Sequence, residues 1–285
     1  MPRTHISYSE LKIWSECAYK HKLVYIDDVA GFEGNEYTAF GTALHNACEA
    51  LALSNYSLRS WEQFTLEEVL QLFQEDFLKE LKTLKGKNLP LKPELIESMR
   101  TAATDIIPMI IPALNKTFGE FELFGTEDRL YEPIEDYCPD EKQEGCFRFK
   151  GFVDIILKTR DGKYHVIDWK TCSWGWDSKR KADPITNYQL TLYKYYVHKK
   201  YDIPLDDIVC HFALLKRTAK KDRVEIFKIT TGNRKVKNAL NLMQKAVHNI
   251  SNGNFVKNRL SCTKGFGCEF YQTKHCSSHS GGSIG

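Results

Sequence analysis

The stretch Gly151-Phe-Val-Asp-Ile-Ile-Leu-Lys-Thr-Arg-Asp-Gly-Lys-Tyr-His-Val-Ile-Asp-Trp-Lys170 decides the fold of this chain. Two apolar runs flank the pair Asp161-Gly162, and each run carries one carboxylate, Asp154 or Asp168. Val/Ile-rich runs separated by a short loop that contains Gly predict a β-hairpin. Aspartate is depleted in strands, so one carboxylate in each strand indicates a chemical role.

The length of the loop decides which residues face one another. A two-residue loop would place Asp154 opposite Trp169, whereas a three-residue loop, 160–162, places it opposite Asp168. The three-residue loop needs a left-handed residue at its end, and Gly162 supplies it. Opposed strand residues have Cβ atoms about 4.5–5.5 Å apart, so two carboxylates there repel each other. We therefore expect the three-residue register to require a cation between the two aspartates.

Mg²⁺ and Mn²⁺ prefer the oxygen ligands that such a pair offers. Lys170 follows Asp168 by two positions, and the alternation of strand side chains keeps both on one face. Two carboxylates, an ammonium group and a bound water predict a site for metal-assisted phosphodiester hydrolysis. The alternative is an ordinary exposed hairpin whose polar face holds two aspartates and a lysine.

The segments Gly-Phe-Val-Asp154 and Ile-Asp168-Trp-Lys-Thr resemble the core of the PD-(D/E)XK nuclease superfamily, in its RecB-like branch. Three further marks follow the order of that branch: Phe40-Gly-Thr-Ala-Leu-His45 on an upstream helix, Glu127 on the strand before the hairpin, and Gln189 with Tyr193 on the helix after it. The resemblance spans Ser7 to Cys276. It implies an α/β, restriction-endonuclease-like core, with a mixed central sheet flanked by helices, and a metal-dependent DNA exonuclease that works on free DNA ends.

The resemblance also implies a role for each matched residue. Asp154 and Asp168 would bind Mg²⁺ or Mn²⁺, with His45, Glu127 and the main-chain carbonyl of Trp169 completing or adjusting the site. Lys170 would orient or help to deprotonate the attacking water. Gln189 and Tyr193 would hold the substrate strand or the lysine.

Each of the three motifs outside the hairpin can also be explained without a catalytic role. Asp128 and Glu132 compete with Glu127 for the acidic position. His45 lies in an Ala/Leu-rich, helix-forming stretch, where a lone histidine is commonly a packing residue. Gln189 and Tyr193 are one helical turn apart and share a face, so they also fit an amphipathic packing stripe.

The chain has 9 cysteines, an odd number, and its start has no apolar segment of signal length. Both features argue against a secreted disulfide framework and place the chain in a reducing cytoplasm. Three cysteines gather near the end as Cys262-x5-Cys268-x7-Cys276, and Cys17 is the candidate for a fourth ligand. We interpret the remaining cysteines as packing or surface residues: Cys48, Cys138, Cys146, Cys172 and Cys210.

One early and three late cysteines resemble the arrangement around the 4Fe–4S cluster of AddB-type nucleases. The late triplet is spaced more widely than is common in that group, and Ala18 stands where proline often follows the early cysteine. Four thiolates can equally hold zinc, and His275 or His279 could replace a cysteine in a zinc site. The sequence therefore predicts a cluster that joins Cys17 to the loop 262–276, with zinc as the alternative.

The net charge of the 285-residue chain is +3 at pH 7, which by itself does not indicate a nucleic acid partner. The basic pairs are concentrated after the hairpin, where aromatic residues alternate with them: Trp174, Trp176, Tyr193, Tyr195 and Tyr196. Such a surface can follow a phosphate backbone and stack bases, so DNA is the expected partner. The longest apolar run is too short to cross a membrane. The sequence contains no phosphate-binding Gly-x4-Gly-Lys-Ser/Thr motif, so we expect no helicase motor in this chain.

We expect a single RecB-like nuclease domain over 1–276, with a helical insertion at about 55–118 and a disordered tail at 277–285. Helices are expected over 7–26, 38–53, 65–85, from 93 to the prolines at 108 and 112, over 185–201 and over 232–251. Strands are expected near 121–134, 147–159, 163–171, 208–216 and 223–229. A homo-oligomer or a partner protein of recombination or integration is also compatible with the sequence.

We expect the nuclease to act in recombination, repair or phage DNA processing, and two alternatives remain open. A CRISPR-associated nuclease that trims DNA before integration would use the same residues. A DNA-binding or assembly module that kept the fold and lost catalysis belongs to another class of protein. The intact set of Asp154, Asp168 and Lys170 argues against that last alternative.

Overall fold

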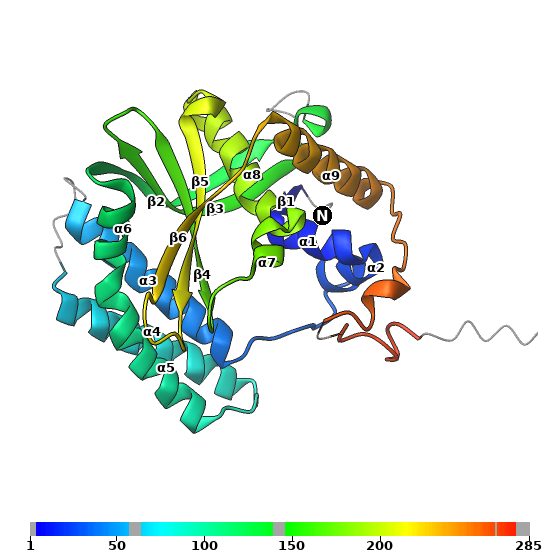
Figure 1. The fold of residues 1–285 in the computed structure, drawn as a ribbon. Helices are drawn as coiled ribbons and strands as arrows, with labels where there is room; N and C mark the ends of the chain where they lie inside the picture. The colour runs from blue at the N-terminus through cyan, green and yellow to red at the C-terminus, as the bar shows by residue number, and fades with distance from the viewer. Residues whose placement is uncertain (1–3, 57–63, 139–145, 266, 278–285) are drawn as a thin grey trace, which may run out of the picture. The chain divides into compact units, whose positions relative to one another are not determined.

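The computed structural model describes residues 4–56, 64–138, 146–265 and 267–277. The chain divides into two compact units, coloured by residue number in Figure 1. The first, which we call the sheet unit, contains residues 34–132 and 151–239. The second, which we call the cysteine unit, contains residues 1–33, 133–150 and 240–285.

The sheet unit is built on β-strands that follow the predicted ranges within a few residues. They are β2 (Phe121–Pro133), β3 (Arg148–Thr159), β4 (Tyr164–Cys172), β5 (Ile208–Lys216) and β6 (Val224–Ile229). β2 and β4 both pair with β3, and the order continues through β5 to β6. β3 and β4 are antiparallel, β4 and β5 are parallel, and β5 and β6 are antiparallel. The sheet is therefore mixed, as predicted.

A parallel pair requires a long crossover, and the chain between β4 and β5 supplies one. It contains α7 (Ser178–Ala182), α8 (Pro184–Tyr201) and a short 3₁₀ turn (Leu205–Asp207). Asp183 caps the start of α8 by accepting from the amide of Thr186, and Pro184 takes the first helical position, which proline favours. In Figure 1, α8 lies on one side of the sheet and helices α3 to α6 lie on the other.

The helical block comprises α3 (Glu36–Tyr56), α4 (Leu66–Gly86), α5 (Pro93–Ile106), a 3₁₀ turn (Ile107–Met109) and α6 (Ile110–Phe118). The capping box predicted at Thr65 and Glu68 is present at the start of α4. The helix that begins at Pro93 breaks at Pro108, as expected, but not at Pro112. Pro112 lies in the first turn of α6, where the amide that proline lacks would have no helical partner.

The core of the sheet unit lies between this helical block and the sheet. Phe40, Phe73 and Phe77 pack against each other, with ring centroids 5.6–6.0 Å apart. Trp169 and Leu215 of the sheet belong to the same buried cluster. Both faces of β5 are mostly buried, which explains its continuous apolar run.

In the cysteine unit, a short strand that the sequence did not predict, β1 (His5–Ser7), pairs in parallel with Arg148–Lys150 of β3. The single helix expected over 7–26 is three pieces: α1 (Tyr8–Glu16), α2 (Ala18–His21) and a π-helical turn (Lys22–Ile26). The break falls at Cys17, whose backbone is extended, with φ −162° and ψ 112°. The prediction of one continuous helix was therefore wrong.

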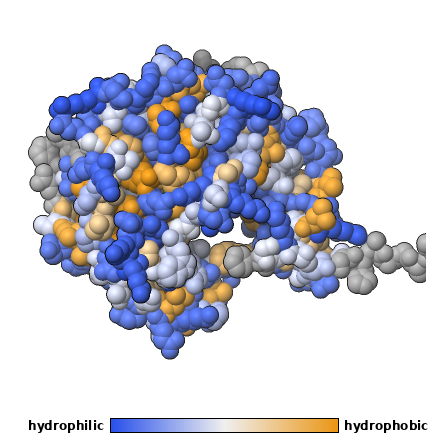
Figure 2. All heavy atoms as spheres, in the orientation of Figure 1, coloured by the Kyte–Doolittle hydropathy of each residue, from blue (hydrophilic) through white to orange (hydrophobic). Residues whose placement is uncertain are grey.

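The remaining elements are a 3₁₀ turn (Glu135–Tyr137), α9 (Asn233–Ser251) and a 3₁₀ turn (Arg259–Ser261) that leads into the late cysteines. Of the predicted tail, only Ser277 belongs to the described residues. Hydrophilic side chains dominate the face shown in Figure 2, with apolar groups scattered among them. In the part of the chain that the structure describes, no helix has both the length and the apolar character needed to cross a membrane.

Candidate active site

The β3–β4 hairpin has the register that the three-residue loop predicts. Ile155 pairs with Ile167, and the amide of Thr159 donates to the carbonyl of Lys163 at 3.0 Å. Gly162 closes the loop with φ +79°, in the left-handed region. When the register is continued by one pair beyond Ile155, Asp154 lies opposite Asp168.

Asp154 lies at the point where the regular pairing of β3 with β4 ends. Its Oδ2 accepts a hydrogen bond from the backbone amide of Trp169 at 2.6 Å, and Nδ1 of His45 lies 3.7 Å from the same oxygen. Burial and the neighbouring charge of Asp168 raise the pKa of Asp154 well above its ordinary value. The pair thus carries the like-charge repulsion that a bound cation would offset.

Asp168 is buried, with 1% of its surface exposed, and both of its oxygens lie close to polar groups. Gln189 Nε2 donates to Oδ1 at 2.6 Å, and Lys170 Nζ lies 2.7 Å from Oδ2. Gln189 also donates to the hydroxyl of Tyr193 at 3.3 Å, so α8 and β4 are joined at the site. Burial and the charge of Asp168 raise the pKa of Tyr193, which remains a neutral phenol.

His45 comes from α3 and reaches the end of the hairpin. Burial lowers its pKa to about 4, against the opposing effect of Asp168, and a backbone hydrogen bond of Trp169 also raises it. The imidazole is therefore neutral near neutral pH, which is the form that binds metal ions. The structure brings His45, Asp154, Asp168 and Trp169 together.

Glu127 and Asp128 are adjacent in the sequence, but their side chains have different surroundings in the structure. Asp128 Oδ1 accepts hydrogen bonds from Lys200 Nζ at 2.7 Å and from the hydroxyl of Tyr201 at 2.9 Å, so it fastens β2 to α8. Glu127 is the more exposed of the two residues and has a left-handed backbone with φ +44°. Partial burial and the carboxylates of Glu49 and Asp168 raise its pKa, which places Glu127 within electrostatic reach of the aspartate pair.

Glu49 is a site neighbour that the sequence reasoning missed. It follows His45 by one turn of α3, and its Oε1 accepts a hydrogen bond from Thr126 Oγ1 at 3.1 Å. Residues four apart on a helix share a face. The spacing from His45 to Glu49 was the available signal.

The donor atoms of this site fit a hard divalent cation in type, since carboxylate oxygens, a carbonyl oxygen and a neutral imidazole are available. Among the described residues, no three or more His, Cys, Asp and Glu side chains are arranged to hold a metal ion. The suitability of the site for a divalent cation rests instead on the opposed carboxylates and on the raised pKa of Asp154. Of the suggested ligands, Asp154 and Asp168 are the two in opposed positions on the hairpin.

Four cysteines line one cavity of about 290 Å³ in the cysteine unit: Cys17, Cys262, Cys268 and Cys276. The amide of Asn258 donates to Sγ of Cys17 at 3.4 Å, and the amide of Cys268 donates to the carbonyl of Cys262 at 2.9 Å. The extended backbone at Cys17 ends α1 directly before this cavity. The four thiols share a cavity, but, like the other described residues, they are not arranged as a group of three or more metal ligands.

Two of the other cysteines differ from the prediction. Cys138 and Cys146 form a disulfide, with Cα atoms 4.5 Å apart, whereas we expected packing or surface residues at both positions. The backbone explains the proximity, because Phe147 exchanges hydrogen bonds with Ile134 and Tyr137 and brings the two cysteines opposite each other. Cys48, Cys172 and Cys210 are free, in line with the prediction.

The aromatic residues expected to form a DNA-binding surface are mostly buried. Trp176, Tyr193 and Tyr196 are 7%, 6% and 1% exposed, and Tyr195 is half-buried. Trp174 is 72% exposed. The expectation of an extended aromatic surface was therefore wrong for all but Trp174, because α8 turns most of its aromatic rings toward the protein interior.

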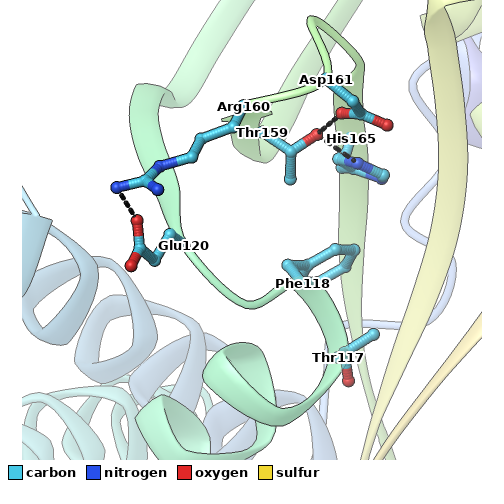
Figure 3. Close-up of a pocket in the computed structure, with 7 residues that line it drawn as sticks. All are labelled: Thr117, Phe118, Glu120, Thr159, Arg160, Asp161 and His165. Atoms are coloured by element: carbon cyan, nitrogen blue, oxygen red, sulfur yellow. Dashed lines mark hydrogen bonds and ion pairs between the residues drawn. The ribbon is translucent and has the colours of Figure 1, made fainter.

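A pocket of about 520 Å³ lies at the loop end of the hairpin (Figure 3) and contains none of the predicted site residues. Arg160 pairs with Glu120 across its mouth, and Thr159 contacts both Asp161 and His165. Nδ1 of His165 lies 3.1 Å from Nε2 of His211. The residues of this pocket hold the hairpin loop and the end of α6 together.

A mixed α/β sheet with opposed aspartates and a neighbouring lysine defines a restriction-endonuclease-like protein. The chain belongs to the PD-(D/E)XK nuclease superfamily, whose family model matches residues 5–273. Membership in this superfamily supports the conclusion that the protein is a nuclease. No curated protein matches the sequence.

Two solved structures are similar to the chain. A crystal structure from Eubacterium rectale, described as that of a candidate exonuclease, is 12% identical, covers 91% of this chain and 86% of its own, and has a TM-score of 0.53. This likeness supports the fold. The crystal structure of SSO0001 is 16% identical over 89% of this chain and 91% of its own, and its TM-score of 0.35 carries no argument.

Proposed function

We propose that this protein is a metal-dependent DNA exonuclease of the RecB-like branch, which hydrolyses phosphodiester bonds from DNA ends. One observation carries the proposal: the hairpin register sets Asp154 opposite Asp168, and Lys170 Nζ lies 2.7 Å from Asp168 Oδ2. This is the pairing of carboxylates and ammonium that phosphodiester hydrolysis uses with Mg²⁺ or Mn²⁺. The Eubacterium rectale neighbour, described as a candidate exonuclease, agrees with action on ends.

In this proposal Asp154 and Asp168 hold the cation, and His45, Glu127 and the carbonyl of Trp169 complete its surroundings. The cation, when bound, polarises the phosphate and lowers the pKa of a water ligand. Lys170 holds the attacking water in line and offsets the negative charge that develops on the phosphorane-like transition state. The water oxygen bonds to phosphorus and gives up a proton to solvent, the bond to the leaving oxygen breaks, and that oxygen takes up a proton from solvent.

Gln189 acts on Asp168 in this scheme. Its hydrogen bond at 2.6 Å fixes the rotamer of the carboxylate, and Tyr193 in turn orients the amide of Gln189. Partners of this kind around a metal ligand determine its direction and its basicity. Gln189 and Tyr193 are therefore positioning residues in the proposed mechanism.

The nuclease proposal is tested by digestion of end-labelled linear DNA with Mg²⁺ or Mn²⁺, using the anaerobically purified protein. We expect metal-dependent shortening that Lys170→Ala abolishes, and the position of the label gives the polarity. Lys82→Ala, on the exposed side of α4, is the matched control and should digest DNA at the unaltered rate. DNA that is bound but not cut by the unaltered protein would favour the non-catalytic DNA-binding module instead.

We also propose that Cys17, Cys262, Cys268 and Cys276 hold a 4Fe–4S cluster with a structural role, with zinc as the alternative. Their common cavity supports this assignment. Iron, sulfide and zinc analysis of the purified protein distinguishes the two metals. Cys268→Ala should lose the metal and lower the folding yield together with activity, whereas Cys172→Ser, outside the cavity, should keep both. A Cys268→Ala protein of unchanged stability but without activity would contradict the structural role.

A further inference from the structure

We propose that Tyr37, Arg217 and Trp174 form a platform on which the bases of single-stranded DNA stack beside the catalytic residues. The proposal rests on the proposed nuclease function for the kind of substrate, and it adds residues and a strand preference that the function alone does not give. All three residues belong to the sheet unit, as do Asp154, Asp168 and Lys170.

Arg217 contacts Tyr37 and is hydrogen-bonded to the segment that carries Trp174. The guanidinium carbon of Arg217 lies 5.1 Å from the centroid of the Tyr37 ring, in cation–π geometry. Nη2 of the same arginine donates to Ser173 Oγ at 3.2 Å, and its amide donates to the carbonyl of Cys172 at 2.8 Å. Arg217 thus connects the start of α3 to the segment that follows β4, where Trp174 is the next residue after Ser173.

Tyr37 and Trp174 are among the exposed aromatic residues of this protein. Tyr37 is 50% exposed and Trp174 is 72% exposed, whereas Trp169 and Trp176 are 2% and 7% exposed. Arg217 covers one side of the Tyr37 ring, and half of the residue remains open to solvent. Open aromatic faces next to a guanidinium group suit nucleobases joined by phosphates, since the rings stack the bases and the cation attracts the phosphates.

The platform lies a few nucleotides from the catalytic residues. Tyr37 precedes His45 by eight residues on α3, a rise of about 12 Å along the helix axis. Trp174 follows Lys170 by four residues, so the two Cα atoms are at most about 14 Å apart. At about 3.4 Å per nucleotide along one strand, these separations correspond to three or four nucleotides.

The chemistry selects single strands over duplexes. Bases inside a duplex already stack on their neighbours, so an aromatic side chain can take a base face only where the strand is unpaired. Stacking tolerates every base, since each has a π-face, which suits an enzyme that digests DNA of any sequence. We therefore expect the strand next to the scissile bond to be unpaired over three or four nucleotides.

The test compares two fluorescent probes of equal length in EDTA, which prevents metal-dependent cleavage: oligo(dT) and an abasic oligomer with the same number of phosphates. Binding is measured by anisotropy for the full-length protein and for Tyr37→Ala and Trp174→Ala. Each variant should bind oligo(dT) roughly 5- to 100-fold more weakly, from the usual strength of base–aromatic stacking, and should bind the abasic probe as the unaltered protein does. Tyr37→Phe and Trp174→Phe keep the ring and should bind both probes normally.

Tyr37→Leu and Trp174→Leu keep apolar bulk without an aromatic face, and thermal melting verifies that each variant is folded. A leucine variant that binds oligo(dT) as well as the unaltered protein overturns the platform, as does an equal loss for both probes. Failure of the unaltered protein to bind oligo(dT) also overturns it. Because the assay needs no cleavage, a protein that never cuts DNA but shows the base-dependent loss would refute the nuclease and leave the platform standing.

Discussion

Gln189 is the side chain through which α8 acts on the candidate site, since it donates to Asp168 and to Tyr193 at once. Replacing it with leucine removes the donor and leaves a buried carboxylate oxygen without that partner. The usual effect of losing such a partner is a 10- to 100-fold drop in metal affinity or activity. We expect this drop for Gln189→Leu, measured as the Mn²⁺ concentration needed for half-maximal cleavage. Gln71→Leu, on the exposed side of α4, is the control, and an equal loss there would refute the argument.

Glu127 and Asp128 are adjacent acidic residues with different surroundings, so their variants should differ. Glu127→Gln removes a carboxylate near Asp168 and should lower the cleavage rate by 10-fold or more, with little change in the free energy of unfolding. Asp128→Asn weakens the contacts with Lys200 and Tyr201 and should reduce stability by about 1 kcal/mol, with a smaller effect on cleavage. Parallel cleavage assays and urea unfolding of both variants measure the contrast. The reverse pattern would mean that Asp128 is the acidic residue of the site.

At the scale of single residues, the sequence was informative wherever local geometry determines position. Asp154, Asp168 and Lys170 follow from strand alternation and loop length, and the register agrees. Glu49 was missed although it follows His45 by one helical turn, because its contact with Thr126 depends on how α3 packs against β2. The burial of Tyr196 likewise depends on the neighbours of α8.

At the scale of elements, the hairpin depends on the left-handed conformation of Gly162. Its φ of +79° would strain any residue with a Cβ, although an added Cβ would meet no atom within 4 Å. Gly162→Ala should therefore reduce the free energy of unfolding by about 1–2 kcal/mol. Gly232 also has open space around it but no positive φ, so Gly232→Ala should change stability by less than about 0.5 kcal/mol. Equal effects in urea unfolding would show that the loop does not require a left-handed residue.

Element boundaries were predictable where end signals are strong and were missed where they are weak. The capping box at Thr65 gave the start of α4, and Pro93 gave the start of α5. The three residues of β1 are too few to show a period, and they form a strand only because β3 lies beside them. The break at Cys17 has no proline or glycine to mark it.

At the scale of the whole molecule, the buried His211 of β5 and the half-buried His165 of β4 should make stability depend on pH. Burial, His165 and Lys228 lower the pKa of His211 to about 3, and burial lowers the pKa of His165. A histidine of normal pKa in the unfolded chain binds a proton near pH 6.5. Below that pH the unfolded state gains protons before the folded state does, so stability falls as the pH is lowered.

The His211 contribution alone should lower the free energy of unfolding by about 2 kcal/mol between pH 7.5 and pH 5. His211→Gln removes this contribution, so its stability should fall by about that much less over the same range. Urea unfolding at several pH values measures both slopes. His248→Gln, an exposed histidine of α9, is the control and should keep the slope of the unaltered protein. Parallel slopes for the unaltered protein and His211→Gln would contradict the argument.

The division into two compact units could not be predicted from the sequence, because the cysteine unit is assembled from three separate segments of the chain. The Cys138–Cys146 disulfide joins residues only 8 positions apart, but the backbone hydrogen bonds that bring the two cysteines together have no signal in the sequence. The alternation of apolar and polar residues predicts which side chains of one helix or strand share a face. It does not predict which distant segments of the chain pack together. The α/β class and the mixed sheet were predictable because each strand and helix is individually well marked.

The cavity that joins Cys17 to the late cysteines imposes an order of events during synthesis. Cys17 and its hydrogen-bond partner Asn258 are 241 positions apart, and at about 5–20 residues per second the ribosome needs about 12–50 s to cover that distance. The sheet unit, which ends at residue 239, leaves the ribosome before the three late thiols do. During that interval Cys17 meets the metal ions and oxidants of its compartment without Cys262, Cys268 and Cys276 beside it. The segment that carries the three late cysteines therefore closes the cysteine unit, and a chain truncated before residue 262 would contain the complete sheet unit but could not form the cysteine cavity.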